Sequence, residues 1–175
     1  MDARIDRITK AIRDVPDFPR PGILFKDITP VVADPRTFAD TIDLLHGRYA
    51  GKGIGAVVAI EARGFIFGGP LAARLGCGMA LVRKAGKLPY QSDRVSYALE
   101  YGEGALEMHV DALKKGQRVV IVDDLLATGG TAKAAAELCA RQGAEIAEYA
   151  FLVELAFLGG RERLAPIPVH GLVTF

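Results

Sequence analysis

Residues 119–131, VVIVDDLLATGGT, place two acidic side chains directly before a loop of small residues. The β-branched run that precedes Asp123 and Asp124 indicates the end of a buried strand. Glycines in the loop let successive backbone N–H groups turn inward, and a helix beginning there would add the positive end of its dipole. Such a loop suits a phosphate monoester, while carboxylates accept hydrogen bonds from vicinal hydroxyls. The combination predicts a sugar-phosphate site.

Simpler interpretations exist for each half of this stretch. The carboxylates could be a solvated strand end, but adjacent like charges at a buried strand repel each other unless a partner neutralises them. The glycines could form an ordinary turn with Thr131 as a helix N-cap, an equal alternative on those residues alone. A phosphate-loop nucleotidase would need GxxxxGK[ST], and the sequence contains neither that motif nor GxGxxG.

The surrounding sequence alternates apolar runs with helix-favouring segments. Continuous apolar runs predict strands at residues 56–60, 79–82, 119–122 and 147–153. Helical spacing and composition predict helices at residues 5–15, 35–49, 65–75 and 132–142, the last capped by Gly143. Residues 83–94 are polar and predict a long loop, and a β-hairpin with Gly102 and Gly104 between its strands follows.

This order of elements predicts an α/β fold with a mostly parallel central sheet and helices on both faces. The 175 residues suffice for a single domain, 1–175. Ligands of such sheets gather at the carboxyl ends of the strands. The segments EARG, RKAGK and DDLLATGGT are all expected there, with the hairpin inserted at the same edge.

Composition excludes several classes of partner. The formal net charge is +1, so no overall field favours nucleic acid or an acidic membrane. No apolar run approaches the roughly 20 residues of a membrane span, and the N-terminus lacks a signal-peptide core. Cys77 and Cys139 lie far apart in apolar contexts and are predicted to be buried free thiols. His46, His109 and His170 have no ligand-like spacing. A cytoplasmic protein is predicted.

The stretch at residues 119–131 resembles the phosphoribosyl-pyrophosphate motif of the type I phosphoribosyltransferases. The resemblance covers nearly the whole chain through the segments FPRPGILFKDITP, EARGFIFG, VRKAGKLP, SYALEYG, VVIVDDLLATGGT and VELAFLGGRERL. EARGF and SYALEYG make it similar, more narrowly, to the adenine phosphoribosyltransferase family. The resemblance implies the type I phosphoribosyltransferase fold with a flexible loop over the active site. It also implies that residues 1–34 form part of a hood over the base.

The implied reaction transfers the 5-phosphoribosyl group from phosphoribosyl pyrophosphate to N9 of adenine, giving AMP and pyrophosphate. Asp123 and Asp124 would face the ribose hydroxyls, directly or through water. The 5′-phosphate would lie in the loop formed by Ala127, Thr128, Gly129, Gly130 and Thr131. Arg63 would act beside the pyrophosphate, in a segment where the family often has an unusual peptide bond. The basic residues closing over pyrophosphate would be Arg83, Lys84 and Lys87.

For the base, the resemblance implies that Phe25 stacks on adenine opposite Leu125. Backbone groups around Leu24 and Lys26 would read the purine edge. Glu100 would be the acid–base residue near the imidazole nitrogens, although its alternation in the hairpin fits a solvent-facing residue equally well. Mg²⁺ would be carried by the pyrophosphate without a direct protein ligand, and the family is commonly homodimeric.

Ordinary structural roles are open for the other residues. On periodicity alone Phe25 would be a core residue. Arg63 could form an exposed ion pair with Glu61, and Lys84 and Lys87 could be a solvated loop face. A related enzyme for hypoxanthine, guanine or xanthine would be expected to offer a donor to the exocyclic oxygen, and none is evident. A non-catalytic regulator that senses phosphoribosyl pyrophosphate would usually need an additional DNA-binding domain and a basic surface.

Overall fold

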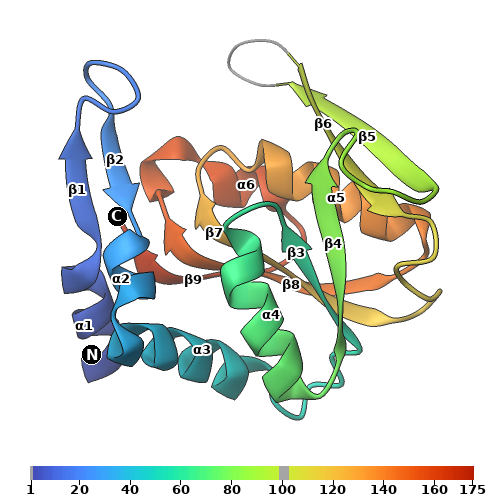
Figure 1. Ribbon diagram of the computed structural model, residues 1–175, viewed down its shortest axis with the longest axis horizontal. Coiled ribbons are helices and arrows are strands. Elements are labelled where there is room, and N and C mark those ends of the chain that lie inside the picture. The colour runs from blue at the N-terminus through green and yellow to red at the C-terminus, as the bar shows by residue number, and fades with distance from the viewer. Residues whose placement is uncertain (1, 99–102) are drawn as a thin grey trace.

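The computed structural model describes residues 2–98 and 103–175, so the predicted catalytic residue Glu100 lies outside the described residues. Its centre is a seven-stranded sheet in the order β5-β6-β4-β3-β7-β8-β9 (Figure 1). The strands are β3 Ala56–Ile60, β4 Gly78–Lys84, β5 Ser92–Ala98, β6 Glu103–His109, β7 Arg118–Leu126, β8 Glu145–Glu154 and β9 Val169–Thr174. The five strands from β4 to β9 in this order pair in parallel. At one edge of the sheet, β6 pairs antiparallel with both β4 and β5. The predicted α/β fold with a mostly parallel sheet is confirmed.

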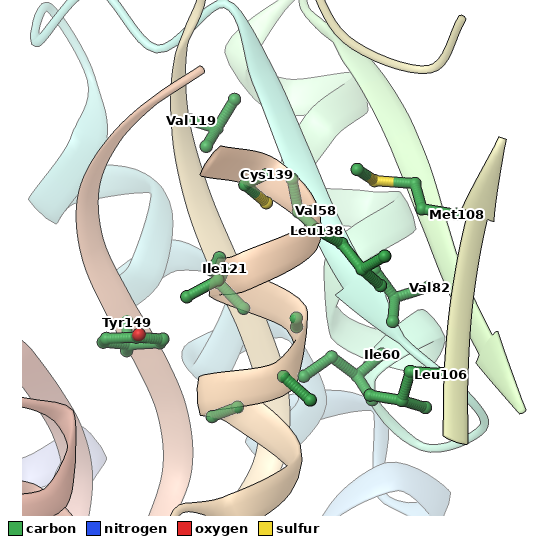
Figure 2. Close-up of a cluster of buried hydrophobic side chains, with 14 of the residues drawn as sticks. Val58, Ile60, Val82, Leu106, Met108, Val119, Ile121, Leu138, Cys139 and Tyr149 are labelled. Carbon is green, nitrogen blue, oxygen red and sulfur yellow. The ribbon is translucent and has the colours of Figure 1, made fainter. Parts of the chain in front are cut away.

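Helices cover both faces of this sheet, so its central strands are buried on both sides. Val57 and Val120 pack with the helices α1 to α4, whereas Val58 and Ile121 pack with α5 and α6. This alternation follows from the two-residue period of a strand. Figure 2 shows Leu138 and Cys139 of α5 among the side chains of the second face. The helices are α1 Ala3–Ala11, α2 Thr29–Ala33, α3 Pro35–Tyr49, α4 Gly64–Leu75, α5 Gly130–Arg141 and α6 Gly160–Leu164.

The predicted helix at residues 35–49 is confirmed, and its beginning has a local cause. Asp34 is the N-cap, and its side chain accepts hydrogen bonds from the backbone N–H groups of Arg36 and Thr37. Pro35 occupies the first turn, where its missing N–H has no cost. The next element along the chain, β3, pairs directly with β7, the strand that carries the two acidic residues.

Several predicted boundaries were wrong. The first helix ends at Ala11, and Val15 lies instead in β1 (Arg13–Pro16), which pairs with β2 (Leu24–Asp27). The predicted loop at residues 83–94 is shorter at both ends, because β6 pairs with β4 as far as Lys84 and with β5 from Ser92.

The acidic strand is also longer than its apolar run. β7 continues to Leu126, because β8 pairs with it as far as the Leu126–Glu154 register. Asp123 and Asp124 therefore belong to the strand and do not follow it. The 3₁₀ turn Ala156–Leu158, α6 and β9 were not predicted.

Two hairpins frame the sheet edge where the site was expected. In Figure 1, the β1–β2 and β5–β6 hairpins rise on either side of the segment that joins β7 to α5.

Both cysteines are free thiols, as predicted. Cys139 is buried, but Cys77 is partly exposed, contrary to prediction. Among the described residues, no helix is long and apolar enough to span a membrane.

Candidate active site

A cavity of about 470 Å³ lies at the carboxyl ends of β3, β4 and β7. Its position confirms that the three segments expected at this edge of the sheet converge. The predicted site residues that line it are Arg63, Lys84, Lys87, Asp123, Asp124, Leu125, Ala127, Thr128, Gly129, Gly130 and Thr131. The sequence motif and the basic segments therefore face one space.

The hood residues do not line this cavity. Phe25 packs edge-on against Phe18, with ring centroids 5.1 Å apart. Lys26 Nζ lies 2.6 Å from an Asp14 oxygen and 3.8 Å from the centre of the Phe175 ring.

The loop at residues 127–131 leads into α5 through a glycine, and Thr131, the N-cap considered in the simpler interpretation, lies inside the helix. Gly129 is the N-cap of α5 and has φ +80°, a conformation that side-chain-bearing residues rarely adopt. The loop packs against Gly160 at the start of α6, a residue that sequence reasoning missed. A Cβ on Gly160 would overlap the carbonyl oxygen of Ala127, and a Cβ on Gly129 would lie 2.9 Å from the carbonyl oxygen of Gly160. The two adjacent glycines in VELAFLGGRERL were the available signal.

The two acidic residues differ in their surroundings. Asp124 is buried, and its Oδ2 accepts a hydrogen bond from Arg63 Nε at 2.5 Å. Asp123 accepts one from the backbone N–H of Asp124 at 2.9 Å. Burial, together with the charge of Asp124, raises the pKa of Asp123 well above its usual value. Gly64 allows this approach of α4 to β7, because a Cβ there would lie 2.8 Å from the carbonyl oxygen of Val122.

Arg63 thus has a different partner from the one considered in the ion-pair alternative. Burial opposes its charge, but the hydrogen bond to Asp124 and the nearby acidic groups leave its pKa raised. Glu61, the partner considered in that alternative, pairs with Arg83 and Lys87 instead. The peptide bond between Glu61 and Ala62 is cis, in the segment for which the resemblance implied an unusual peptide bond.

Glu61, considered from the sequence only as a partner of Arg63, is the second site residue that sequence reasoning missed. Its side chain is 9 % exposed, and its carboxylate accepts hydrogen bonds from Arg83 Nη2 at 2.9 Å and Lys87 Nζ at 3.1 Å. The backbone N–H of Lys84 donates to its other oxygen at 3.0 Å. The hydrogen bond from Arg83, with those from Lys84 and Lys87, lowers the pKa of Glu61 to about 2. The carboxylate of Glu61 is therefore an anion held by donors of Arg83, Lys84 and Lys87.

The cavity can therefore bind one molecule with two kinds of group. Its loop offers backbone N–H donors at a helix N-terminus, where anions are favoured. The same cavity is lined by the basic residues Arg63, Lys84 and Lys87, called the basic wall below, and by the carboxylates of Glu61, Asp123 and Asp124. This arrangement fits a sugar that bears a phosphate at one end and a second anionic group at the other.

Comparison with known proteins agrees with that arrangement. Residues 31–166 match the family model described as the phosphoribosyl transferase domain, which covers more than half of the chain. The fold and the site together define a phosphoribosyltransferase, a pentosyl-transferring enzyme.

Individual relatives narrow the class. Adenine phosphoribosyltransferase from Anaeromyxobacter dehalogenans (strain 2CP-C) is 57 % identical over 171 residues, covering 98 % of this chain and 99 % of the relative. The crystal structure of adenine phosphoribosyltransferase from Thermoanaerobacter pseudethanolicus ATCC 33223 superposes with a TM-score of 0.94 at 49 % identity, over 98 % of this chain and 99 % of the other. That of Saccharomyces cerevisiae, complexed with an iminoalditol bisphosphate and adenine, gives 0.93 at 40 % identity, with coverages of 98 % and 99 %. The chain belongs to the adenine phosphoribosyltransferase family.

Proposed function

We propose that this enzyme transfers the 5-phosphoribosyl group from phosphoribosyl pyrophosphate to N9 of adenine, producing AMP and pyrophosphate in purine salvage. The observation that carries the proposal is the joining of a phosphate-binding loop, two carboxylates and a basic wall in one cavity. Family membership supports adenine as the acceptor, and the yeast relative was crystallised with adenine.

In this proposal each wall of the cavity binds one part of the donor substrate. The N–H groups of residues 127–131 hold the 5′-phosphate, and Asp123 and Asp124 accept hydrogen bonds from the ribose hydroxyls. Arg63, Lys84 and Lys87 face the pyrophosphate. Negative charge grows on pyrophosphate as its bond to the ribose C1 breaks, and fixed cations stabilise such developing charge. Arg83 stabilises this group of cations by donating hydrogen bonds to the carbonyl oxygen of Lys87 and to the carboxylate of Glu61.

The base-binding part of the proposal rests on the resemblance. Leu125 lines the cavity and is available as one wall of the adenine slot. Phe25 would form the other wall, with backbone groups around Leu24 and Lys26 reading the purine edge, once the hood closes toward the cavity. Glu100 is proposed to take the proton from the imidazole ring, a contribution typically worth about 10²–10⁴-fold.

Mg²⁺ is proposed to enter with the pyrophosphate. The pyrophosphate would carry this ion without a direct protein ligand, and the carboxylates of Asp123 and Asp124 line the same cavity, where water bound to the ion would reach them. Bound Mg²⁺ would neutralise charge on the departing pyrophosphate. The resemblance further supports a homodimer and a cytoplasmic location.

A base-specificity assay tests the proposal. Purified protein with Mg²⁺ and phosphoribosyl pyrophosphate is given adenine, hypoxanthine, guanine or xanthine, and pyrophosphate release is followed. We expect kcat/KM for adenine to exceed the others by at least about 100-fold, because sites that hydrogen-bond a purine edge reject the wrong edge strongly. Equal or reversed rates would assign a 6-oxopurine substrate. Binding of the donor with no release for any base would indicate a regulator.

A further inference from the structure

The carboxylate of Glu61 accepts hydrogen bonds from three residues of the basic segment 83–87. Arg83 Nη2 and Lys87 Nζ both donate to its Oε1, and the backbone N–H of Lys84 donates to its Oε2. Arg83 Nη1 also donates to the carbonyl oxygen of Lys87 at 2.8 Å. The segment from Lys84 to Lys87 is therefore tied to the end of β3 at both of its ends.

The desolvation of Glu61 and Arg83 in this arrangement costs free energy, which favours a functional role over simple packing. A carboxylate that is 9 % exposed loses most of its hydration, which must be replaced by donors. Arg83 does not gain a full set of bonds in return, since its buried Nε has no acceptor among the described residues. The guanidinium is oriented by Glu61 and the Lys87 carbonyl, and its buried Nε–H is left without an acceptor in the part of the chain that the structure describes.

Without this carboxylate, the basic side chains would repel each other and sample more rotamers. Lys84 and Lys87 are like charges in one wall, Lys87 is 50 % exposed, and long exposed side chains sample many rotamers. Ordering such a side chain on binding costs about 0.5–1.5 kcal/mol, which a pre-formed geometry avoids.

We propose that Glu61 is a positioning residue for pyrophosphate, which holds Lys87, Arg83 and the intervening loop in their binding geometry before substrate arrives. The inference rests on the proposed function and deepens it. Glu61 does not contact the reacting atoms; it acts through the cations. It restricts the pyrophosphate half of the site and leaves the 5′-phosphate loop unaffected, since its described hydrogen bonds all go to the basic segment.

The experiment replaces the charge and keeps the shape. In Glu61→Gln the charge is lost, and the amide N–H₂ must face either the donors of Arg83 and Lys87 or the backbone N–H of Lys84, so part of the hydrogen-bond set is lost. We expect the Kd for pyrophosphate and the KM for phosphoribosyl pyrophosphate to rise about tenfold. The Kd for ribose 5-phosphate and the KM for adenine should change less than about twofold. Glu61→Asp retains the charge and should recover part of the pyrophosphate affinity.

Glu107→Gln is the matched control. Glu107 Oε2 accepts a hydrogen bond from the backbone N–H of Gly86 at 2.9 Å, in the same loop, and among the described residues it forms no ion pair with a Lys or Arg. This variant should bind pyrophosphate like the wild type, and thermal unfolding would verify that all variants are folded.

The outcomes separate the inference from the function on which it rests. Unaltered or tighter pyrophosphate binding by Glu61→Gln would overturn the positioning role, as would an equal loss of ribose 5-phosphate binding. Wild-type protein that bound no pyrophosphate would overturn the proposed function as well. A selective loss in Glu61→Gln, with the control unchanged, would establish the role.

Discussion

The segment of residues 123–131 and the basic wall line the same cavity but are built differently. The first is one continuous segment, in which the loop at residues 127–131 joins the end of β7 to α5. The wall is assembled from the ends of β3 and β4, and its groups are long side chains held by ion pairs. Backbone donors need only the correct fold, whereas side-chain cations also need a counter-charge that orders them.

The carboxylates of the two regions reflect the same difference. Asp123 sits among acidic and buried groups, which raises its pKa, whereas Glu61 sits among cations, which lower its pKa to about 2. Asp123 is proposed to accept hydrogen bonds from the ribose hydroxyls, whereas Glu61 already accepts hydrogen bonds from the protein. The first carboxylate is suited to binding, and the second to holding other groups in place.

The largest expected effect is on the acidic end of β7. Replacing both Asp123 and Asp124 by Asn should raise the KM for phosphoribosyl pyrophosphate by roughly 100-fold or more, since hydrogen bonds to charged groups contribute about 1.5–3 kcal/mol each. The KM for adenine should change by less than about threefold. Steady-state kinetics with each substrate varied measures both. Asp111→Asn, at an exposed position outside the cavity, is the control; a similar loss in both KM values would contradict the assignment to ribose.

A smaller effect is expected where the loop contacts α6. Gly160→Ala places a methyl group against the carbonyl oxygen of Ala127, and overpacking of this kind costs about 1–3 kcal/mol of unfolding free energy. The loop carbonyl must move, so binding of ribose 5-phosphate should weaken more than binding of pyrophosphate. Urea unfolding and ligand titration measure the two effects.

Gly159→Ala is the control for that substitution. Gly159 has φ +66° but only a flexible Glu162 oxygen at 3.4 Å from an added Cβ. Its cost should be about 1 kcal/mol, from backbone strain alone, with ribose 5-phosphate binding unchanged. Equal effects of the two substitutions on ligand binding would show that Gly160 does not shape the loop.

The ease of predicting each region from sequence follows from its construction. The loop was recognised because its carboxylates, glycines and helix start are consecutive residues. The bond between Glu61 and Arg83 joins residues 22 apart and exists because Ile60 pairs with Val82 in the parallel register of β3 and β4. A strand register is a tertiary property, so the pairing could not be inferred from the neighbouring letters.

The same reasoning applies to the fold. The buried parallel strands and the long helices were predicted because their apolar periodicity is strong. α6 has five residues and β1 four, too few for a periodic pattern. The ends of β4 and β7 were set too early because charged residues continue both strands, held there by pairing with β6 and β8.

The smallest effect concerns how stability depends on pH, and here the two regions should respond with opposite sign. Asp123 has a folded-state pKa raised above the ordinary 3.8, so the native state keeps a proton that the unfolded state has lost. Its contribution to stability therefore falls as pH rises above about 3.8. Glu61 has a pKa lowered from 4.5 to about 2, so its contribution is present above 4.5 and is lost as pH falls toward 2.

Urea unfolding of wild type, Asp123→Asn and Glu61→Gln at a series of pH values measures this difference. The stability of wild type relative to Asp123→Asn should decrease as pH rises from 3.8 toward neutrality. Relative to Glu61→Gln it should increase from pH 2 to 4.5 and then remain constant. If both differences changed in the same direction, the two carboxylates would share one kind of environment, and the contrast between a binding region and a positioning region would not hold.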